Sequence, residues 1–206
     1  MEIIYCRGGD KFAPNLAAAA GMRYGVRYDY TAYGDVYMLD GGLNPRWAHY
    51  QKRAAKLRPH FALVPDYFRP DEISLHLYIQ DVARFAPRVG VCPKFTGAVY
   101  HIPSDCVICE SIPSEYAGWI IPDDELLSNR DYHLLGGDPR AQKSEIQRIH
   151  ARGGRVVSLD GNKLAMKAAH GQVFSASGKW LKHDASTEQN AMISAHELIE
   201  FFSSAR

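Results

Sequence analysis

Short runs of apolar residues alternate with longer stretches of helical periodicity along most of the chain. Apolar runs typical of strands buried on both faces lie at residues 3–6, 36–39, 61–64, 88–92, 106–112, 118–121, 132–135 and 155–159. Between several of these runs, apolar residues recur at helical spacing. This alternation favours a parallel sheet, either closed as a barrel or doubly wound.

Capping residues indicate where helices begin and end. Asn44-Pro45 predicts the start of a first helix, because Asn caps helices and Pro has no N–H to leave unpaired. Its predicted apolar face comprises Trp47, Tyr50, Ala54 and Leu57. The apolar positions of a second predicted helix are Ile73, Leu77 and Phe85.

Three further helices are predicted in the second half of the chain. The first, at 140–151, ends at Gly153-Gly154, and a short one, at 162–169, ends at Gly171. The last, at 186–202, opens with a capping box of Ser186 and Gln189. Its apolar stripe comprises Met192, Ala195, Ile199 and Phe202. Residues 172–182 predict a hairpin that turns at Ser177-Gly178.

About eight strand candidates, with no G-x-G-x-x-G after the first, favour the barrel over the doubly wound sheet. We therefore predict an α/β fold: a compact (β/α)8 TIM-like barrel, a single domain over residues 1–206, with a C-terminal hairpin and helix. Such barrels rarely have fewer than ~200 residues. Some helices should therefore be reduced, and the connections at 95–105 and 113–117 are the shortest or least regular.

Charge and hydropathy limit the possible partners and compartments. Lys plus Arg (24) nearly balances Asp plus Glu (23), so any nucleic-acid surface must come from local clusters. No apolar run approaches the ~18 residues of a membrane span, and the first residues lack a signal-peptide pattern. We expect a soluble, cytoplasmic protein with no membrane partner.

The four cysteines include one paired spacing, Cys106-x-x-Cys109. A zinc site there would need two further ligands, of which Cys92 and His101 are the nearest candidates. The alternative is a buried strand that uses cysteine as a small apolar residue. We expect the alternative to hold, and hence no metal or other cofactor.

Three predicted strands run into an aspartate, at Asp40-Gly41-Gly42, Pro65-Asp66-Tyr67 and Asp160-Gly161-Asn162. A fourth ends in Gly136-Gly137-Asp138. The carboxyl ends of all strands share one face of a parallel barrel, so these aspartates should converge on one pocket. Taken singly, each could be only a turn former or a helix cap.

Converging carboxylates suit the chemistry of a glycosidic bond. One can attack C1′ to form a covalent glycosyl-enzyme, while another handles the proton of the departing or arriving group. A third can accept hydrogen bonds from the adjacent N1–H and N2 amine of a guanine edge. The same geometry also suits plain sugar hydrolysis.

At these residues the chain resembles the guanine transglycosylase superfamily, and most closely the phage and bacterial enzymes that install 7-deazaguanine bases in DNA. The family's Asp-Ser-Gly-Gly motif resembles Asp40-Gly41-Gly42, and its base-recognising strand resembles 63–66. Its Leu-Met-Gly-x-Gly ending resembles 133–137, and its nucleophile strand resembles 158–160. The order of these elements holds over residues 35–162.

The resemblance implies a (β/α)8 barrel and a role for each element. Asp160 would be the nucleophile and Asp40 the general acid/base. Asp66 and Gly41 would bind the base, and Leu135, Gly136 and Gly137 would pack against its ring. The substrates would be DNA, guanine and a 7-deazaguanine such as 7-cyano-7-deazaguanine (preQ0). A phage-encoded protein acting in the host cytoplasm, as a homodimer or with a partner subunit, would fit this role.

Two departures from the family narrow the substrate. The tRNA enzymes carry a cysteine-rich zinc site after the nucleophile strand, but no cysteine follows Cys109 here. This favours DNA over tRNA. The family's Val-Gln-Gly is replaced by Val91-Cys92-Pro93-Lys94, so a base-contacting Gln is missing and Lys94 would point at a phosphate or at solvent.

A target base must be flipped out of a duplex or lie in a single strand. We expect the DNA backbone to contact basic residues near the barrel mouth, namely Arg46, Lys163, Lys167, Lys179 and Lys182, and a base to stack on Trp180. Two alternatives remain open. One is a nucleoside N-glycosidase or deoxyribosyltransferase, and the other is a non-catalytic nucleic-acid-binding barrel.

Overall fold

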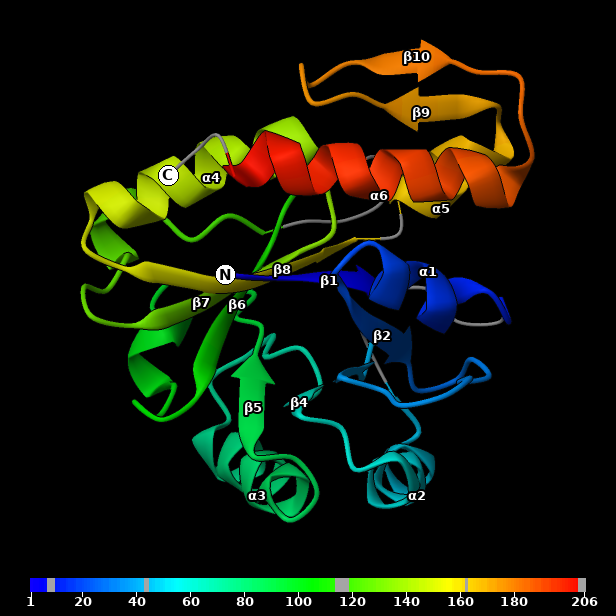
Figure 1. Ribbon diagram of the computed structural model, residues 1–206. Helices are drawn as coiled ribbons and strands as arrows, with labels where there is room; N and C mark the ends of the chain where they lie inside the picture. The colour runs from blue at the N-terminus through cyan, green and yellow to red at the C-terminus, as the bar shows by residue number, and fades with distance from the viewer. Residues whose placement is uncertain (7–9, 43–44, 114–118, 162, 204–206) are drawn as a thin grey trace.

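Eight parallel strands close into a barrel in a computed structural model that describes residues 1–6, 10–42, 45–113, 119–161 and 163–203 (Figure 1). The strands follow one another around the barrel in chain order, and β8 pairs with β1, with Asp160 opposite Ile4. The predicted (β/α)8 barrel is therefore confirmed. The strands are β1 (Glu2–Cys6), β2 (Arg23–Arg27), β3 (Met38–Asp40), β4 (Phe61–Leu63), β5 (Arg88–Val91), β6 (Val107–Ser111), β7 (Asp131–Leu135) and β8 (Arg155–Gly161).

The outer helical layer is incomplete, as the short chain predicted. Its helices are α1 (Ala13–Ala19), α2 (Trp47–Leu57), α3 (Glu72–Ala83), α4 (Pro139–Ala151), α5 (Lys163–Ala169) and α6 (Thr187–Ser203). Within the described residues, the connections after β2, β5 and β6 contain no α-helix. The last two hold only the 3-10 turns η1 (Ala98–His101) and η2 (Asp123–Glu125).

One strand was missed in the sequence, and one strand assignment was wrong. We did not predict β2, whose sequence Arg-Tyr-Gly-Val-Arg has a charge at each end and a glycine in its centre. Residues 118–121 do not form a barrel strand. Trp119 makes only an isolated antiparallel bridge to Ser111, and residue 118 lies outside the described residues.

The helix predictions also need correction. We did not predict α1. The predicted cap Asn44 lies outside the described residues, and α2 begins at Trp47 with Arg46 as its N-cap residue. In α3 the expected buried positions are wrong, because Ile73 is 78% exposed and Leu77 57% exposed. Leu75 and Val82 are the buried residues of this helix.

The C-terminal hairpin and helix agree with the predictions. Strands β9 (Gln172–Phe174) and β10 (Trp180–Lys182) pair antiparallel, and Gly178 in the turn has φ +82°. The capping box is formed, with Gln189 N–H donating to Ser186 Oγ at 3.2 Å and Ser186 N–H donating to Gln189 Oε1 at 3.1 Å. The helix α6 packs against α5, β9 and α1.

Apolar side chains fill two separate regions. The larger region lies between the strands and the helices, and the smaller contains only side chains of the barrel interior, among them Phe61. A Cβ on Gly90 would lie 2.8 Å from the Phe61 ring, so the interior accommodates this ring only beside a glycine. Cys106 belongs to the larger region and Cys109 to the smaller. These thiols lie on opposite sides of the sheet and cannot share a zinc ion.

Candidate functional site at the barrel mouth

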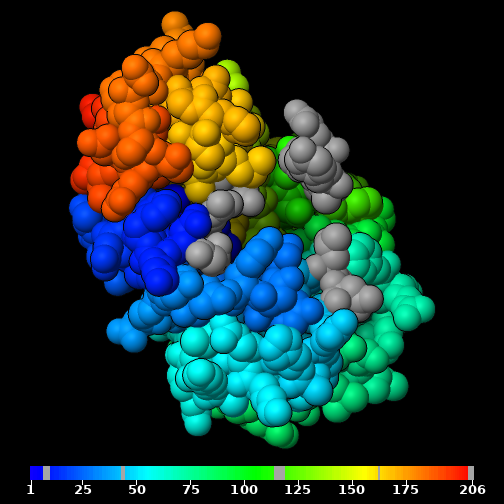
Figure 2. Space-filling view, turned by 90° about the vertical axis from the view of Figure 1, so that its right-hand side faces the viewer, coloured from blue at the N-terminus to red at the C-terminus, as the bar shows by residue number. Residues whose placement is uncertain are grey.

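The three predicted aspartates lie at the carboxyl ends of their strands. Asp40 is the last residue of β3, Asp66 follows β4, and Asp160 is the penultimate residue of β8. Figure 2 shows this face of the molecule, which is hollowed between α1, α5 and the segment that joins β2 to β3. The charge of Asp40 raises the pKa of both Asp66 and Asp160, so the three carboxyl groups are electrostatically coupled in one site.

Asp160 lies deepest in the mouth, with 6% of its surface exposed. Its Oδ1 accepts a hydrogen bond from the Gly136 N–H at 2.9 Å, and it also contacts the Cys6 thiol. Burial, together with the charge of Asp40, raises the pKa of Asp160 to about 7. Asp160 can therefore change its ionisation state near neutral pH, and such shifted carboxyl groups are often found at functional sites.

Asp40 has a more polar environment than Asp160. Its Oδ1 accepts a hydrogen bond from the Gly42 N–H at 2.7 Å, and the guanidinium of Arg27 is close enough to lower its pKa. Burial outweighs both effects, so that the pKa of Asp40 is raised. The neighbouring Gly41 is packed closely, because a Cβ there would lie 3.1 Å from the Leu63 carbonyl oxygen.

Asp66 forms a buried ion pair with Lys94, whose Nζ lies 3.4 Å from Asp66 Oδ2. The chain continues in extended form beyond β4 and β5, and the bridge between Tyr67 and Pro93 places the two side chains beside each other. Burial still raises the pKa of Asp66 to about 6, although Lys94 opposes this. Lys94 is only 9% exposed at its side chain, so the expectation that it points at a phosphate or at solvent was wrong.

The glycine pair after β7 shapes the floor of the mouth. Gly136 and Gly137 both have positive φ, at +63° and +83°, and a Cβ on Gly137 would lie 2.4 Å from Ile112. A Cβ on Gly136 would meet no atom within 4 Å, so its backbone faces open space. The side-chain amide of Gln142 donates to the carbonyl oxygens of Gly136 and Asp160, each at 2.7 Å, and fixes this loop to β8.

Several residues of the mouth were not predicted from sequence. Cys6 and His133 both lie beside Asp160, and Gln142 secures the glycine loop. Each reaches the site through the pairing of neighbouring strands or from a following helix. No local motif marks them, although Cys6 and His133 do lie on predicted strands. Leu135, predicted to contact the base, packs partly buried against the barrel interior.

Some of the predicted DNA-contacting residues are held by other side chains of the protein, and others are exposed. Lys163 forms an ion pair with Asp138 at 3.0 Å, and the Trp180 ring N–H donates to the same carboxylate at 3.2 Å. Trp180 is half-buried against Phe174, with Lys167 Nζ 5.9 Å from its ring centre. These contacts hold the hairpin against the rim, so Trp180 is not a free stacking platform. The exposed residues of the set are Arg46, Lys179 and Lys182.

Among the residues that the structure describes, no group of three or more His, Cys, Asp or Glu side chains is arranged to hold a metal ion. The thiol of Cys106 is also poorly suited to metal binding, because burial raises its pKa to about 11. In the described part of the chain, no helix is both long enough and apolar enough to cross a membrane.

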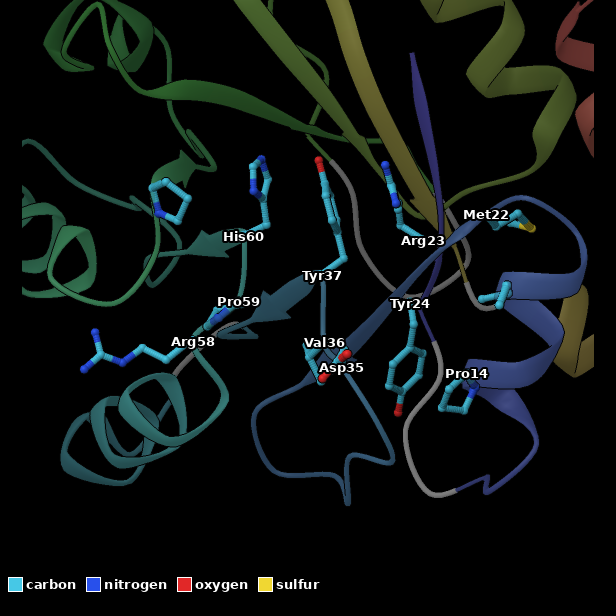
Figure 3. A pocket seen from close by; sticks show the side chains of 13 residues that line it. Pro14, Met22, Arg23, Tyr24, Asp35, Val36, Tyr37, Arg58, Pro59 and His60 are labelled. Carbon is cyan, nitrogen blue, oxygen red and sulfur yellow. The ribbon is translucent and has the colours of Figure 1, made fainter.

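A groove of about 540 Å³ lies on the outside of the barrel, where the connection from β2 to β3 carries no α-helix in the described chain (Figure 3). It lies between α1 and the end of α2, at the amino ends of β2, β3 and β4. Figure 3 shows Arg23, Tyr37 and His60 side by side along it. The Tyr37 and His60 rings stack with centres 4.9 Å apart. None of the predicted site residues lines this groove.

The closed barrel with its carboxylate cluster at the carboxyl ends of the strands defines a TIM-barrel protein. Residues 15–202 match the model of a protein family described as a family of unknown function, DUF6610. The chain therefore belongs to the DUF6610 family. A search of the curated proteins finds no match.

Solved structures share the fold. A protein described as a fructose-1,6-biphosphate aldolase from Coccidioides immitis superposes with a TM-score of 0.60 at 10% identity, over 99% of this chain and 90% of that one. The phosphoribosylanthranilate isomerase from Thermotoga maritima gives a TM-score of 0.40 at 11% identity, over 100% and 98% of the two chains. At this identity, the similarity to the aldolase shows the barrel fold alone.

Proposed function

We propose that this protein is a glycosyltransferase that exchanges guanine in DNA for a 7-deazaguanine base, through a glycosyl ester on Asp160. The observation that supports the proposal is the coupling of three carboxyl groups in one barrel mouth, each with a raised pKa. Carboxyl groups with raised pKa values in a shared concave site are typical of acid/base and nucleophilic catalysis.

The two carboxyl groups with coupled pKa values would divide the chemistry. Asp160 attacks C1′ as a carboxylate, the bond from C1′ to guanine N9 breaks, and Asp40 gives its proton to the departing base. The incoming base returns its N9 proton to Asp40 and displaces Asp160 from C1′. Atoms and charges balance over the cycle, and no cofactor takes part. The coupling supports this assignment, because a proton on one group favours ionisation of the other.

The ion pair of Asp66 and Lys94 would read the edge of the base. Guanine presents one acceptor, O6, beside two donors, N1–H and the N2 amine. Lys94 is a donor and Asp66 an acceptor, held with Nζ and Oδ2 3.4 Å apart, so the pair has the matching polarity. Lys94 would thus supply the hydrogen-bond donor that the Gln of the Val-Gln-Gly motif supplies in the transglycosylases.

The base would reach this site from a flipped nucleotide or a single strand, at a cost of a few kcal/mol. Arg46 is exposed at the start of α2, next to the segment that follows Asp40, and can contact the DNA backbone. Lys179 and Lys182 are exposed on the hairpin, which Asp138 ties to the rim. With a net charge of +1, binding should depend on these few contacts, and because the salt dependence grows with the number of phosphate contacts, affinity should fall only gradually with salt.

The test is incorporation of labelled guanine or 7-cyano-7-deazaguanine into DNA, in single-stranded and duplex form. Wild type should incorporate label and form an acid-stable adduct with DNA, and Asp160→Asn should do neither. Asp105→Asn is the matched control, because Asp105 is exposed and precedes β6 at the opposite end of the barrel. Equal incorporation by wild type and Asp160→Asn, or none by wild type, would refute the proposal.

A free nucleoside is the second candidate substrate. It is favoured by one observation: Lys163 and Trp180 are engaged by Asp138, so two of the residues expected to contact a polymer are already paired within the protein. The same assay distinguishes the two. Turnover of deoxyguanosine at a rate equal to that of a deoxyoligonucleotide would assign the activity to nucleosides.

A further inference from the structure

A buried histidine lies directly beneath Asp160 in the barrel. His133 on β7 is fully buried, and its Nε2 lies 3.8 Å from Asp160 Oδ1. This nitrogen makes no hydrogen bond, although buried polar atoms rarely lack one. A register shift between β7 and β8 at Tyr132 and His133 sets the histidine opposite Ser158 and two positions before the aspartate.

The contact between the ring and Ser158 allows the tautomer in which Nε2 carries the proton. His133 Nδ1 lies 2.8 Å from Ser158 Oγ, and Ser158 is itself buried. A serine hydroxyl has a single proton to donate, and Nδ1 is the only side-chain partner of that hydroxyl among the described residues. If Ser158 O–H donates to Nδ1, then Nδ1 is the acceptor and Nε2 carries the ring proton. That N–H is directed to the side of Asp160.

We propose that His133 is a positioning residue, whose Nε2–H donates to the Asp160 carboxylate when that group is ionised. The inference rests on the proposed role of Asp160 as a nucleophile. At 3.8 Å the contact is too long for a hydrogen bond, and a small shift of the carboxylate toward the ring would close it. Together with Gly136 N–H and the Cys6 thiol, His133 would complete a set of three donors around the anion.

The other groups near this pair support a neutral imidazole. Asp160 faces Cys6 on β1, Asp40 on β3 and Cys109 on β6, and His133 faces Phe61 on β4 and Arg88 on β5. Burial, with the charge of Arg88, lowers the pKa of His133 to about 3, so the ring donates as a neutral group. An imidazolium would carry an unscreened charge into the barrel, whereas a neutral N–H stabilises the carboxylate without one.

The experiment titrates the Asp160 carboxyl carbon by NMR in protein labelled with ¹³C-aspartate, assigned by its absence in Asp160→Asn. In His133→Leu the midpoint should move up by about one pH unit or more, because a hydrogen bond to a charged group is lost. His133→Gln keeps an N–H near the Nε2 position and should titrate close to wild type. Ser158→Ala frees the tautomer and should give a smaller upward shift.

The pH dependence of glycosyl-ester formation should follow the same order in these variants. An unchanged midpoint in a folded His133→Leu protein, or equal shifts in His133→Leu and His133→Gln, would overturn the inference. The titration needs no substrate. Failure of base exchange alone would therefore count against the proposed function, whereas an unmoved titration would count against His133 alone.

Discussion

Replacing Asp160 by Asn should stabilise the protein, and the stabilisation should grow as the pH rises and Asp160 becomes ionised in the wild-type protein. Burial raises the pKa of Asp160 from 3.8 to about 7. Because the folded-state pKa is the higher one, the folded protein holds this proton more tightly than the unfolded chain does. Wild-type stability from this group is therefore fully present below pH 4 and is lost as the pH rises through about 7.

The size of the effect follows from the shift. A shift of one pKa unit corresponds to about 1.4 kcal/mol, so the whole shift corresponds to about 4 kcal/mol. Between pH 5 and pH 8, linkage gives a loss of about 2–3 kcal/mol in the free energy of unfolding of wild type. Asn has the same shape and can still accept from Gly136 N–H, but it does not ionise. The free energy of unfolding of Asp160→Asn should therefore not fall in this way between pH 5 and pH 8, except for the contribution from Asp40, whose charge is coupled to Asp160.

Urea unfolding at pH 5 and pH 8 measures this difference. The stability gain of Asp160→Asn over wild type should be about 2–3 kcal/mol larger at pH 8 than at pH 5. Asp105→Asn, at an exposed position, should show no such dependence. A gain that is the same at both pH values would mean that Asp160 is already ionised at pH 5. The argument that burial keeps its proton near neutral pH would then be wrong.

Three further predictions concern the loop, the ion pair and the last helix. Gly137→Ala should lower the free energy of urea unfolding by about 3 kcal/mol, because the position has positive φ and the new Cβ clashes with Ile112. Gly136→Ala has the positive φ but meets no atom, so it should lower the free energy by only about 1 kcal/mol. Equal losses in the two variants would contradict this account. Lys94→Met should lower the free energy of unfolding by about 3–5 kcal/mol at pH 8, because it leaves the Asp66 carboxylate buried without a partner. At pH 5 the loss should be smaller, because Asp66 then takes up a proton. A loss that does not change with pH would contradict the ion pair. Ser186→Ala should lower the free energy of unfolding by about 1 kcal/mol, and Ser186→Thr, which keeps a hydroxyl, should recover most of this loss. Equal stability of wild type and Ser186→Ala would show that the capping box does not stabilise the helix.

The fold could be predicted because buried parallel strands leave a local signal. Seven of the eight barrel strands contain mainly apolar runs that could be recognised in the sequence, since helices or the barrel interior cover their faces. The exception, β2, shows why the signal fails. Its two arginines lie at the barrel ends and its central Gly25 makes room for Ile4 and Met38, so only two apolar side chains remain. In α3, apolar residues occur on several sides, and the exposed Ile73 and Leu77 could not be distinguished from the buried Leu75.

The candidate site was only half predictable. The aspartates follow their strands directly, so sequence order and barrel closure are enough to bring them together. The groups that tune them come from neighbouring strands and depend on register. Lys94 meets Asp66 through the extended pairing beyond β4 and β5, and His133 meets Asp160 through the register shift beside β8. No local pattern records either pairing. Trp180 was expected to contact DNA because it lies among the lysines of the hairpin after β8, but the structure shows this residue tied to Asp138.

A raised carboxyl pKa does not by itself mark a functional site, and this protein contains the counterexample. Glu110 is fully buried, and burial, with the nearby Glu145, raises its pKa to about 8. It faces the outer layer, however, where Arg148 lies 2.8 Å away and the Ile121 N–H donates to it at 2.8 Å. Helix α4, which carries Glu145 and Arg148, covers Glu110, and Glu110 has no exposed surface.

The aspartates of the mouth differ from Glu110 in how their charge is compensated and in how open their surroundings are. Among the described residues, Lys94 pairs with Asp66 alone, and Arg27, which is itself paired with Asp29, only partly offsets the charge of Asp40. The Gly136 backbone beside these carboxyl groups faces open space. A purely structural role would favour an arginine partner or a neutral residue, because each uncompensated carboxylate lowers stability at neutral pH. An arrangement that is unfavourable for stability and open to solvent is expected where the charges are used in a reaction. Position, compensation and access together therefore favour the barrel mouth over the Glu110 network as the location of the proposed reaction.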